Sequence, residues 1–119
     1  MKVFIPMDEK DINSSVSSFF CKAKYFLLAD IKSDAFEIIE NKFLNETIDR
    51  GIKVVNFAIS KANLVIIKSI GNRGFNLFSN ANIKIFKIDD IKAIDAIKLL
   101  KENKLNELTK PLSNCSCKH

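Results

Sequence analysis

Short apolar segments separated by polar turns predict three strands near the start of the chain. Residues 2–5 alternate in character, and Pro6 should end this strand because proline has no amide hydrogen to donate to a sheet. Residues 25–31 are apolar almost throughout, as in a strand that is covered on both faces. In residues 35–40 apolar and acidic side chains alternate, and the polar residues 32–34 suit a turn. We therefore predict that the second and third strands form a hairpin.

From Thr47 the apolar period changes to that of a helix with one buried stripe. The stripe predicted from this period consists of Ile48, Ile52, Val55, Ile59 and Ala62. Val54 and Phe57 lie off the stripe, so they should form an exposed apolar patch for a partner or a dimer.

The second half of the chain alternates between strands and helices. Asp89 or Asp90 should cap the last helix, because a short acidic side chain accepts hydrogen bonds from the first helical amides. This order implies parallel strands joined by helical crossovers. The predicted fold is therefore α/β, a single domain with a mixed five-stranded sheet flanked by helices, in which the first three strands form an antiparallel meander. The predicted segments of the second half are strands 63–67 and 83–86 and helices 72–81 and 91–102.

A polar turn and a Ser-rich loop mark a candidate crevice for an anion. In open α/β sheets, ligands bind beyond the carboxyl ends of the parallel strands, where the first amides of a helix favour negative charge. In this chain that place is the turn 68–74, whose two cations add positive charge and whose glycines let a ligand approach the backbone. The alternative is that Gly71 only forms a tight turn and that the cations are solvated. The candidate ligand-binding residues are Ser17, Ser18, Cys21, Lys68, Gly71, Asn72, Arg73 and Gly74.

The thiols and the single imidazole suggest a metal site. Lysines at positions 22 and 24 favour the thiolate form of Cys21, which is the form that binds a metal or a cluster. Near the end of the chain, alternate positions carry a thiol, a thiol and an imidazole, which share one face of an extended segment. The alternatives are that Cys21 is a core residue and that the tail holds no metal. The candidate metal ligands are Cys21, Cys115, Cys117 and His119.

Composition indicates one folded domain. The chain has 119 residues, of which 47% are hydrophobic, and we expect a domain over residues 1–110 and a flexible tail over 111–119. The formal net charge is +5, but the basic residues are mixed with acids, which argues against a nucleic-acid interface. The first residues predict neither a signal peptide nor a membrane span, so we expect a cytoplasmic protein, whose three Cys should not form a disulfide framework.

The residues needed for catalysis are poorly placed. His119 is the only His, so a nucleophile paired with His would require the tail to fold back into the crevice. The acids on the predicted strands, Asp30, Glu37 and Glu40, do not form the cluster that a two-metal nuclease needs. We therefore expect a protein without catalytic activity.

Two segments resemble a known family. The segment 16–30 reads VSSFFCKAKYFLLAD and is similar to the pattern V-S-x-H-F-G-x-A-x-Y-F-x-x-x-D. The segment 61–86 reads KANLVIIKSIGNRGFNLFSNANIKIF and is similar to G-V-D-V-V-I-x-G-x-I-G-x-x-A-x-x-x-L-x-x-x-G-I-x-V-Y. Both patterns are those of the dinitrogenase iron-molybdenum cofactor biosynthesis family. The resemblance extends from Met1 to about Thr109.

The chain departs from these patterns at several positions. Phe19 stands where the family has His, and Cys21 and Lys68 stand where it has Gly, so the role of that His is not carried over. Glycines that end helices in the family are replaced here by Lys61, Asn82 and Asn103. Asn tolerates the left-handed conformation that glycine adopts at helix ends, which favours a shared backbone geometry.

The resemblance implies a ribonuclease-H-like fold and a non-catalytic carrier. It implies an iron-sulfur or iron-molybdenum cluster as transient cargo, and cofactor-assembly proteins as partners. The residues themselves indicate only an anionic ligand. The alternative function is a small interaction or regulatory domain that binds nucleic acid or a protein through its basic surface. The expected oligomeric state is a monomer or a weak homodimer.

Overall fold

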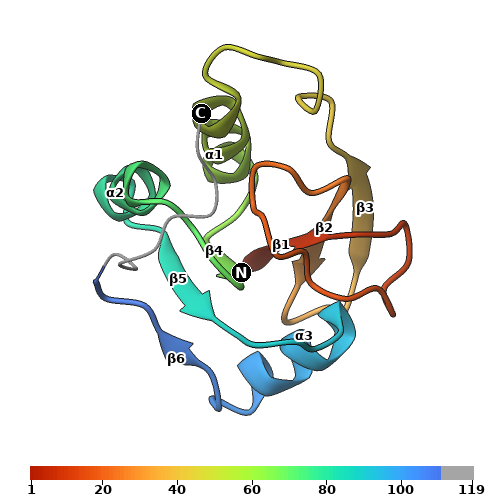
Figure 1. Cartoon of the computed structure of the whole chain (residues 1–119). Coiled ribbons are helices and arrows are strands. Elements are labelled where there is room, and N and C mark those ends of the chain that lie inside the picture. Colours follow the sequence, from red (N-terminus) through yellow and green to blue (C-terminus); the bar gives the residue numbers. More distant parts are fainter. Residues whose placement is uncertain (111–119) are drawn as a thin grey trace.

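The structure is a computed structural model and describes residues 1–110, which form one α/β domain (Figure 1). Within these residues the chain forms a mixed sheet of six strands and three helices. None of these helices is long and apolar enough to cross a membrane. The elements are β1 (Lys2–Met7), β2 (Tyr25–Asp30), β3 (Phe36–Glu40), α1 (Arg50–Lys61), β4 (Leu64–Ile67), α2 (Asn72–Asn80), β5 (Lys84–Lys87), α3 (Ala93–Lys101) and β6 (Asn106–Glu107).

The order of strands across the sheet is β3-β2-β1-β4-β5-β6. β1, β2 and β3 are antiparallel neighbours, which confirms the predicted hairpin and meander. β4 is parallel to both β1 and β5, which confirms the parallel pairing predicted from the alternation of strands and helices. The carboxyl ends of β1, β4 and β5 therefore lie at one edge of the sheet.

β6 was not predicted, and the five-strand count was wrong. The strand has two residues, Asn106 and Glu107, both exposed, so it carries no apolar pattern. It pairs antiparallel with β5, and the Leu108 N–H next to it donates to the Ile85 carbonyl over 2.7 Å. The contact partner, and not the local sequence, defines this strand.

The prediction that Pro6 ends the first strand was also wrong. β1 continues to Met7, and Pro6 is paired in register with Phe26 of β2. The Pro6 carbonyl accepts a hydrogen bond from the Ser17 N–H over 2.9 Å, so the polar backbone groups of Pro6 face away from β2. On that side β4 pairs with β1 only as far as Phe4. The missing amide hydrogen therefore interrupts no ladder.

Apolar residues bury both faces of the sheet. Figure 1 shows α1 and α2 together on one face and α3 on the other. The first face holds a core with the rings of Phe4, Phe20, Phe26 and Phe78, packed against buried residues of α1 and α2. The second face holds a core of Val3, Ile5, Leu27 and Ile66 with Ala93 and Ala96 of α3. β1 and β4 thus contribute side chains to both cores.

The structure corrects the predicted boundaries and buried stripe of the first helix. The helix begins at Arg50 rather than near Thr47, because Asp49 before it has a left-handed backbone with φ 55°. Its buried residues are Gly51, Val54, Val55 and Ala58, whereas Ile48 is 73% exposed. Phe57 packs its ring against Phe4 at 6.0 Å. The exposed patch predicted at Val54 and Phe57 is therefore wrong, because this helix contacts α2 as well as the sheet.

Asn82 and Asn103 have the conformation expected from their replacement of glycine. Their φ angles are 60° and 57°. After α2 the Asn82 N–H donates to the Ser79 carbonyl over 3.1 Å and the Ile83 N–H donates to the Phe78 carbonyl over 2.9 Å. These two bonds are the Schellman arrangement that ends a helix at a left-handed residue. The same pair of bonds ends α3 at Asn103.

The predicted cap of α3 is wrong. The residue before the first helical turn is Lys92, and no side chain caps this end. Bonds from the loop 8–15 hold it instead: the Ala93 N–H donates to the Ser14 carbonyl over 2.9 Å, and the Ile94 N–H donates to the Ile12 carbonyl over 3.2 Å. Asp89 and Asp90 are therefore available for other contacts.

Candidate functional site

The two predicted binding segments lie at the same edge of the sheet. β1 and β4 are parallel, so the segments that follow them leave the sheet on one side. Val16 forms a bridge with Met7, and this bridge returns the loop after β1 to the end of that strand. The Ser17 and Ser18 loop and the turn at residues 68–71 are consequently neighbours.

Lys68 and Ser69 connect this loop to the turn after β4. Lys68 Nζ donates to Ser18 Oγ over 3.2 Å, and Ser69 Oγ donates to the Ser18 carbonyl over 2.7 Å. The side chain of Lys68 is 21% exposed. The structure thus brings together Ser18 and Lys68, two of the predicted ligand-binding residues. That a ligand binds there stays a prediction.

Asp90 is a third member of this site, although its sequence position predicted only a capping role. Its carboxylate forms an ion pair and a hydrogen bond with Lys68 Nζ. The hydrogen bond and the charge of Lys68 hold the pKa of the Asp90 carboxyl below its ordinary value of 3.8. Asp90 is therefore charged at neutral pH. No local pattern relates positions 68 and 90, so only the parallel arrangement of β4 and β5 reveals the pair.

The amino end of α2 adds positive electrostatic potential to the site. Gly71 precedes the helix in an extended conformation with φ −73°, and no side chain caps the first amides. No acidic residue lies in the first turn, and Asn72 and Arg73 are exposed. Unpaired amides and the helix dipole favour an anion at such an end.

Gly74 faces the protein interior. A Cβ added there would lie 3.0 Å from Ile70 Cγ1, 3.1 Å from Ile70 Cδ1 and 3.5 Å from Val55 Cγ2. The absence of a side chain thus allows α2 to pack closely against α1 and the turn before it. Close packing therefore explains why position 74 is a glycine, and no ligand is needed to explain it.

Ser17 and Cys21 are both buried. The side chain of Ser17 is hydrogen-bonded within the loop, where its Oγ donates to the Phe19 carbonyl over 3.3 Å. Cys21 is 1% exposed and belongs to the core that contains Phe4 and Phe20. Its sulfur is therefore not accessible to a ligand in this structure. Under reducing conditions the thiol would still need to become accessible in order to bind a metal.

The predicted metal site is not fully covered by the structure. Cys115, Cys117 and His119 lie outside the described residues, as does the whole predicted tail 111–119. Within residues 1–110, no group of three or more His, Cys, Asp or Glu side chains is arranged to hold a metal ion.

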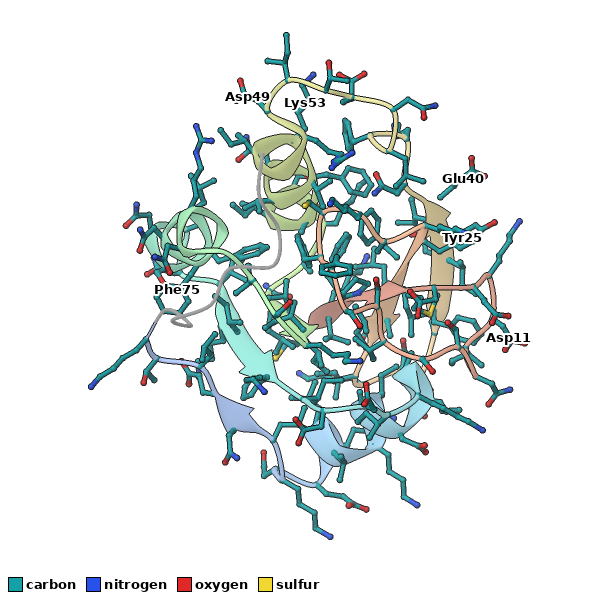
Figure 2. The ribbon with its side chains drawn as sticks, viewed as in Figure 1. Asp11, Tyr25, Glu40, Asp49, Lys53 and Phe75 are labelled. Carbon is teal, nitrogen blue, oxygen red and sulfur yellow. The ribbon has the colours of Figure 1, made fainter. Side chains whose placement is uncertain are left out.

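Asn41 positions the binding loop, and sequence analysis did not identify it. It directly follows Glu40, which Figure 2 shows next to Tyr25 where β3 and β2 pair. Asn41 is 4% exposed, and its Nδ2 donates to the Ala23 carbonyl over 2.7 Å. Its Oδ1 accepts from the Phe43 N–H over 2.9 Å. A polar residue after a strand is usually solvated, so only its burial reveals this role.

Three lysines lie near aromatic rings at two places, Phe19 in the Ser17 and Ser18 loop and Phe57 on α1. Lys22 Nζ is 5.7 Å from the centre of the Phe19 ring, and Lys42 and Lys61 are each 5.8 Å from the centre of the Phe57 ring. None of these three lysines forms an ion pair with a carboxylate in residues 1–110. Cations near aromatic faces contribute about 0.5–1 kcal/mol when exposed.

Comparison with known proteins identifies relatives over most of the chain. The sequence profile of the family described as dinitrogenase iron-molybdenum cofactor matches residues 1–103. An "uncharacterized protein" of Methanocaldococcus jannaschii is 26% identical over 111 residues, which cover 90% of this chain and 91% of that protein.

Solved structures have the same fold. A Thermotoga protein of the DUF35 family is 31% identical, with a TM-score of 0.79 over 92% of this chain and 94% of its own. The apo form of the orange protein from Desulfovibrio gigas has a TM-score of 0.86 over 94% of this chain and 96% of its own, at 17% identity. The second likeness concerns the fold alone.

Proposed function

Because this chain belongs to the dinitrogenase iron-molybdenum cofactor family, we propose that it is a non-catalytic carrier of an anionic iron-sulfur or iron-molybdenum cluster. The proposed binding site consists of Ser18, Lys68, Asn72 and Arg73, at the carboxyl end of β4. Family membership supports the kind of cargo. The ribonuclease-H-like architecture and the cofactor-assembly partners stay predictions from the same resemblance.

The observation that carries the proposal is the position of Lys68. Ser18 holds its ammonium group over 3.2 Å, near an amino end of α2 that has no acidic residue in its first turn. A fixed cation and unpaired amides bind an anion without a covalent ligand. A carrier has to release its cargo, and such contacts exchange faster than several thiolate bonds would.

Anaerobic reconstitution tests this proposal. The protein is incubated under reducing conditions with ferrous iron and sulfide and desalted, and the retained iron and its thiolate or sulfide absorption are measured. The double variant Lys68→Ala with Arg73→Ala should bind about threefold to tenfold more weakly, because each of the two charges contributes about 0.3–0.7 kcal/mol. The fold should remain intact in this variant.

The matched control carries Lys84→Ala and Lys98→Ala. Both control lysines are exposed, and Lys84 begins β5 at the opposite edge of the sheet from Lys68. The net charge changes equally in the two variants. Equal losses of retained iron in both variants would show that binding depends on net charge and not on a specific site. If the wild type retains no iron, the protein is not a cluster carrier.

The lysines near Phe19 and Phe57 support a second candidate, an interaction domain for an anionic macromolecule. Its basis is the set of Lys22, Lys42 and Lys61, which lie over aromatic rings. A single-stranded oligonucleotide should then bind with strong salt dependence, and Lys42→Gln with Lys61→Gln should reduce that dependence. If the salt dependence is the same in this variant as in the wild type, Lys42 and Lys61 do not bind the oligonucleotide.

A further inference from the structure

Asp90 has a contact that the fold itself does not require. α3 begins after Lys92 without any side-chain cap, so Asp90 does not stabilise that helix end. Its carboxylate instead reaches across from the segment after β5 to Lys68 after β4. Asp89, its neighbour, pairs locally with Lys87 at 3.6 Å. Only Asp90 therefore connects to the proposed binding site.

The two partners of the Lys68–Asp90 pair differ in exposure. The side chain of Lys68 is 21% exposed and that of Asp90 is 91% exposed. Lys68 Nζ also donates to Ser18 Oγ, over 3.2 Å. The ammonium group thus has two acceptors, Ser18 Oγ and the largely exposed Asp90 carboxylate. An anion that approaches Lys68 must therefore compete with the Asp90 carboxylate for the ammonium group.

The backbone around Asp90 is held without the ion pair. The Ile88 N–H donates to the Ile67 carbonyl over 2.9 Å, and the Val16 N–H donates to the Ile91 carbonyl over 3.0 Å. A rotation of the Asp90 side chain is therefore enough to free Lys68, and no element has to unfold. The exchange of one acceptor for another at Lys68 Nζ conserves its hydrogen bonds.

We propose that Asp90 is a built-in competitor that any anionic ligand must displace from Lys68. This inference rests on the proposed function and names a residue that regulates the same site. A tethered carboxylate competes at a millimolar effective concentration, whichever anion arrives. The Asp90 carboxylate lowers the affinity for every anion by a similar factor. Small anions with few contacts are then not retained, whereas a cargo that also contacts Ser18 and the end of α2 is retained.

The test compares Asp90→Asn with Asp89→Asn, which removes the same charge one residue away. Inorganic sulfate is titrated at low ionic strength, and binding is followed through the amide signals of residues 68–74. Asp90→Asn should tighten sulfate binding about twofold to fivefold, the range of an exposed ion pair. Asp89→Asn should stay within about 1.5-fold of the wild type, because it changes only the general field.

A second measurement follows the Asp90 carboxyl directly. Its pKa lies below the ordinary value while Lys68 is its partner, and this pKa should rise when sulfate saturates the wild-type protein. Equal sulfate affinities in the two variants, or an Asp90 pKa that sulfate leaves unchanged, would overturn the inference. So would sulfate that binds none of the three proteins. Iron retention in the reconstitution experiment decides the carrier function separately, so the two proposals fail independently.

Discussion

Replacement of Asn41 by Ala should destabilise the protein more than most single substitutions do. The wild-type amide donates to the Ala23 carbonyl over 2.7 Å, and its oxygen accepts from the Phe43 N–H over 2.9 Å. Ala removes these two bonds and the longer one from Nδ2 to the Cys21 carbonyl at 3.4 Å, and it leaves the carbonyls and the N–H without these partners. Each unpaired buried group costs about 1–3 kcal/mol, so the two shorter bonds alone predict a loss of about 2–6 kcal/mol, which corresponds to roughly 8–24 °C in Tm.

Asn41→Asp separates hydrogen bonding from space filling. Asp has nearly the shape of Asn and keeps the acceptor for the Phe43 N–H, but it replaces the donor with an oxygen that repels the Ala23 carbonyl. The Asp variant should therefore lose at least as much stability as the Ala variant. Urea unfolding measures both, with an unchanged slope if the unfolded state is unaffected. Asn45→Ala, at an exposed position four residues later, is the control and should stay within about 0.5 kcal/mol. An Asn41→Asp variant as stable as the wild type would show that the bond from Nδ2 to the Ala23 carbonyl does not stabilise the fold.

Three further changes test other parts of the structure. Gly74→Ala should lower the free energy of unfolding by about 1 kcal/mol, because crowding against Ile70 costs about 1–3 kcal/mol and exceeds the gain in helix propensity of about 1 kcal/mol. Adding Ile70→Val, which removes Cδ1, should recover part of that loss. If the effects of the two substitutions on stability are additive, the close contact is disproved. Asp30 has a pKa below 3.8, chiefly because it accepts from the Lys32 N–H, so its contribution is present above pH 3.8 and is lost as the pH falls through the lowered pKa. Asp30→Asn should accordingly flatten the acidic part of the curve of unfolding free energy against pH. If that part is unchanged, other groups cause the loss of stability at low pH. Truncation after Leu112 should reduce retained iron under reducing conditions, and equal retention would exclude the predicted ligands Cys115, Cys117 and His119.

Local patterns predicted the features that local chemistry determines. Asn82 and Asn103 end their helices in the left-handed conformation because Asn tolerates it next best to glycine, and this tendency is visible in the sequence. The meander was also predictable, since a run of apolar residues between turns has few other arrangements. The family patterns placed Ser18 and Lys68 in two motifs, and their contact follows from the parallel pairing of β1 and β4.

Features that depend on distant partners were not predictable. β6 consists of two exposed residues that only β5 makes into a strand. The period of the first helix indicated a narrow stripe, but this helix packs against both the sheet and α2, so Val54 is buried and Ile48 is not. Asp90 has the sequence of a helix cap and the contacts of a binding-site residue. In each of these positions the tertiary contact outweighs the local preference.

The location of the bound cluster decides whether the carboxyl end of β4 is the binding site. An iron-sulfur cluster broadens the amide signals of nearby residues, so the labelled protein is compared before and after anaerobic reconstitution. We expect selective broadening at Ser17 and Ser18 and across residues 68–74, with β3 and α3 unaffected. Broadening that is confined to another surface, or unchanged signals at 68–74 in the reconstituted protein, would show that the cluster does not bind at the carboxyl end of β4.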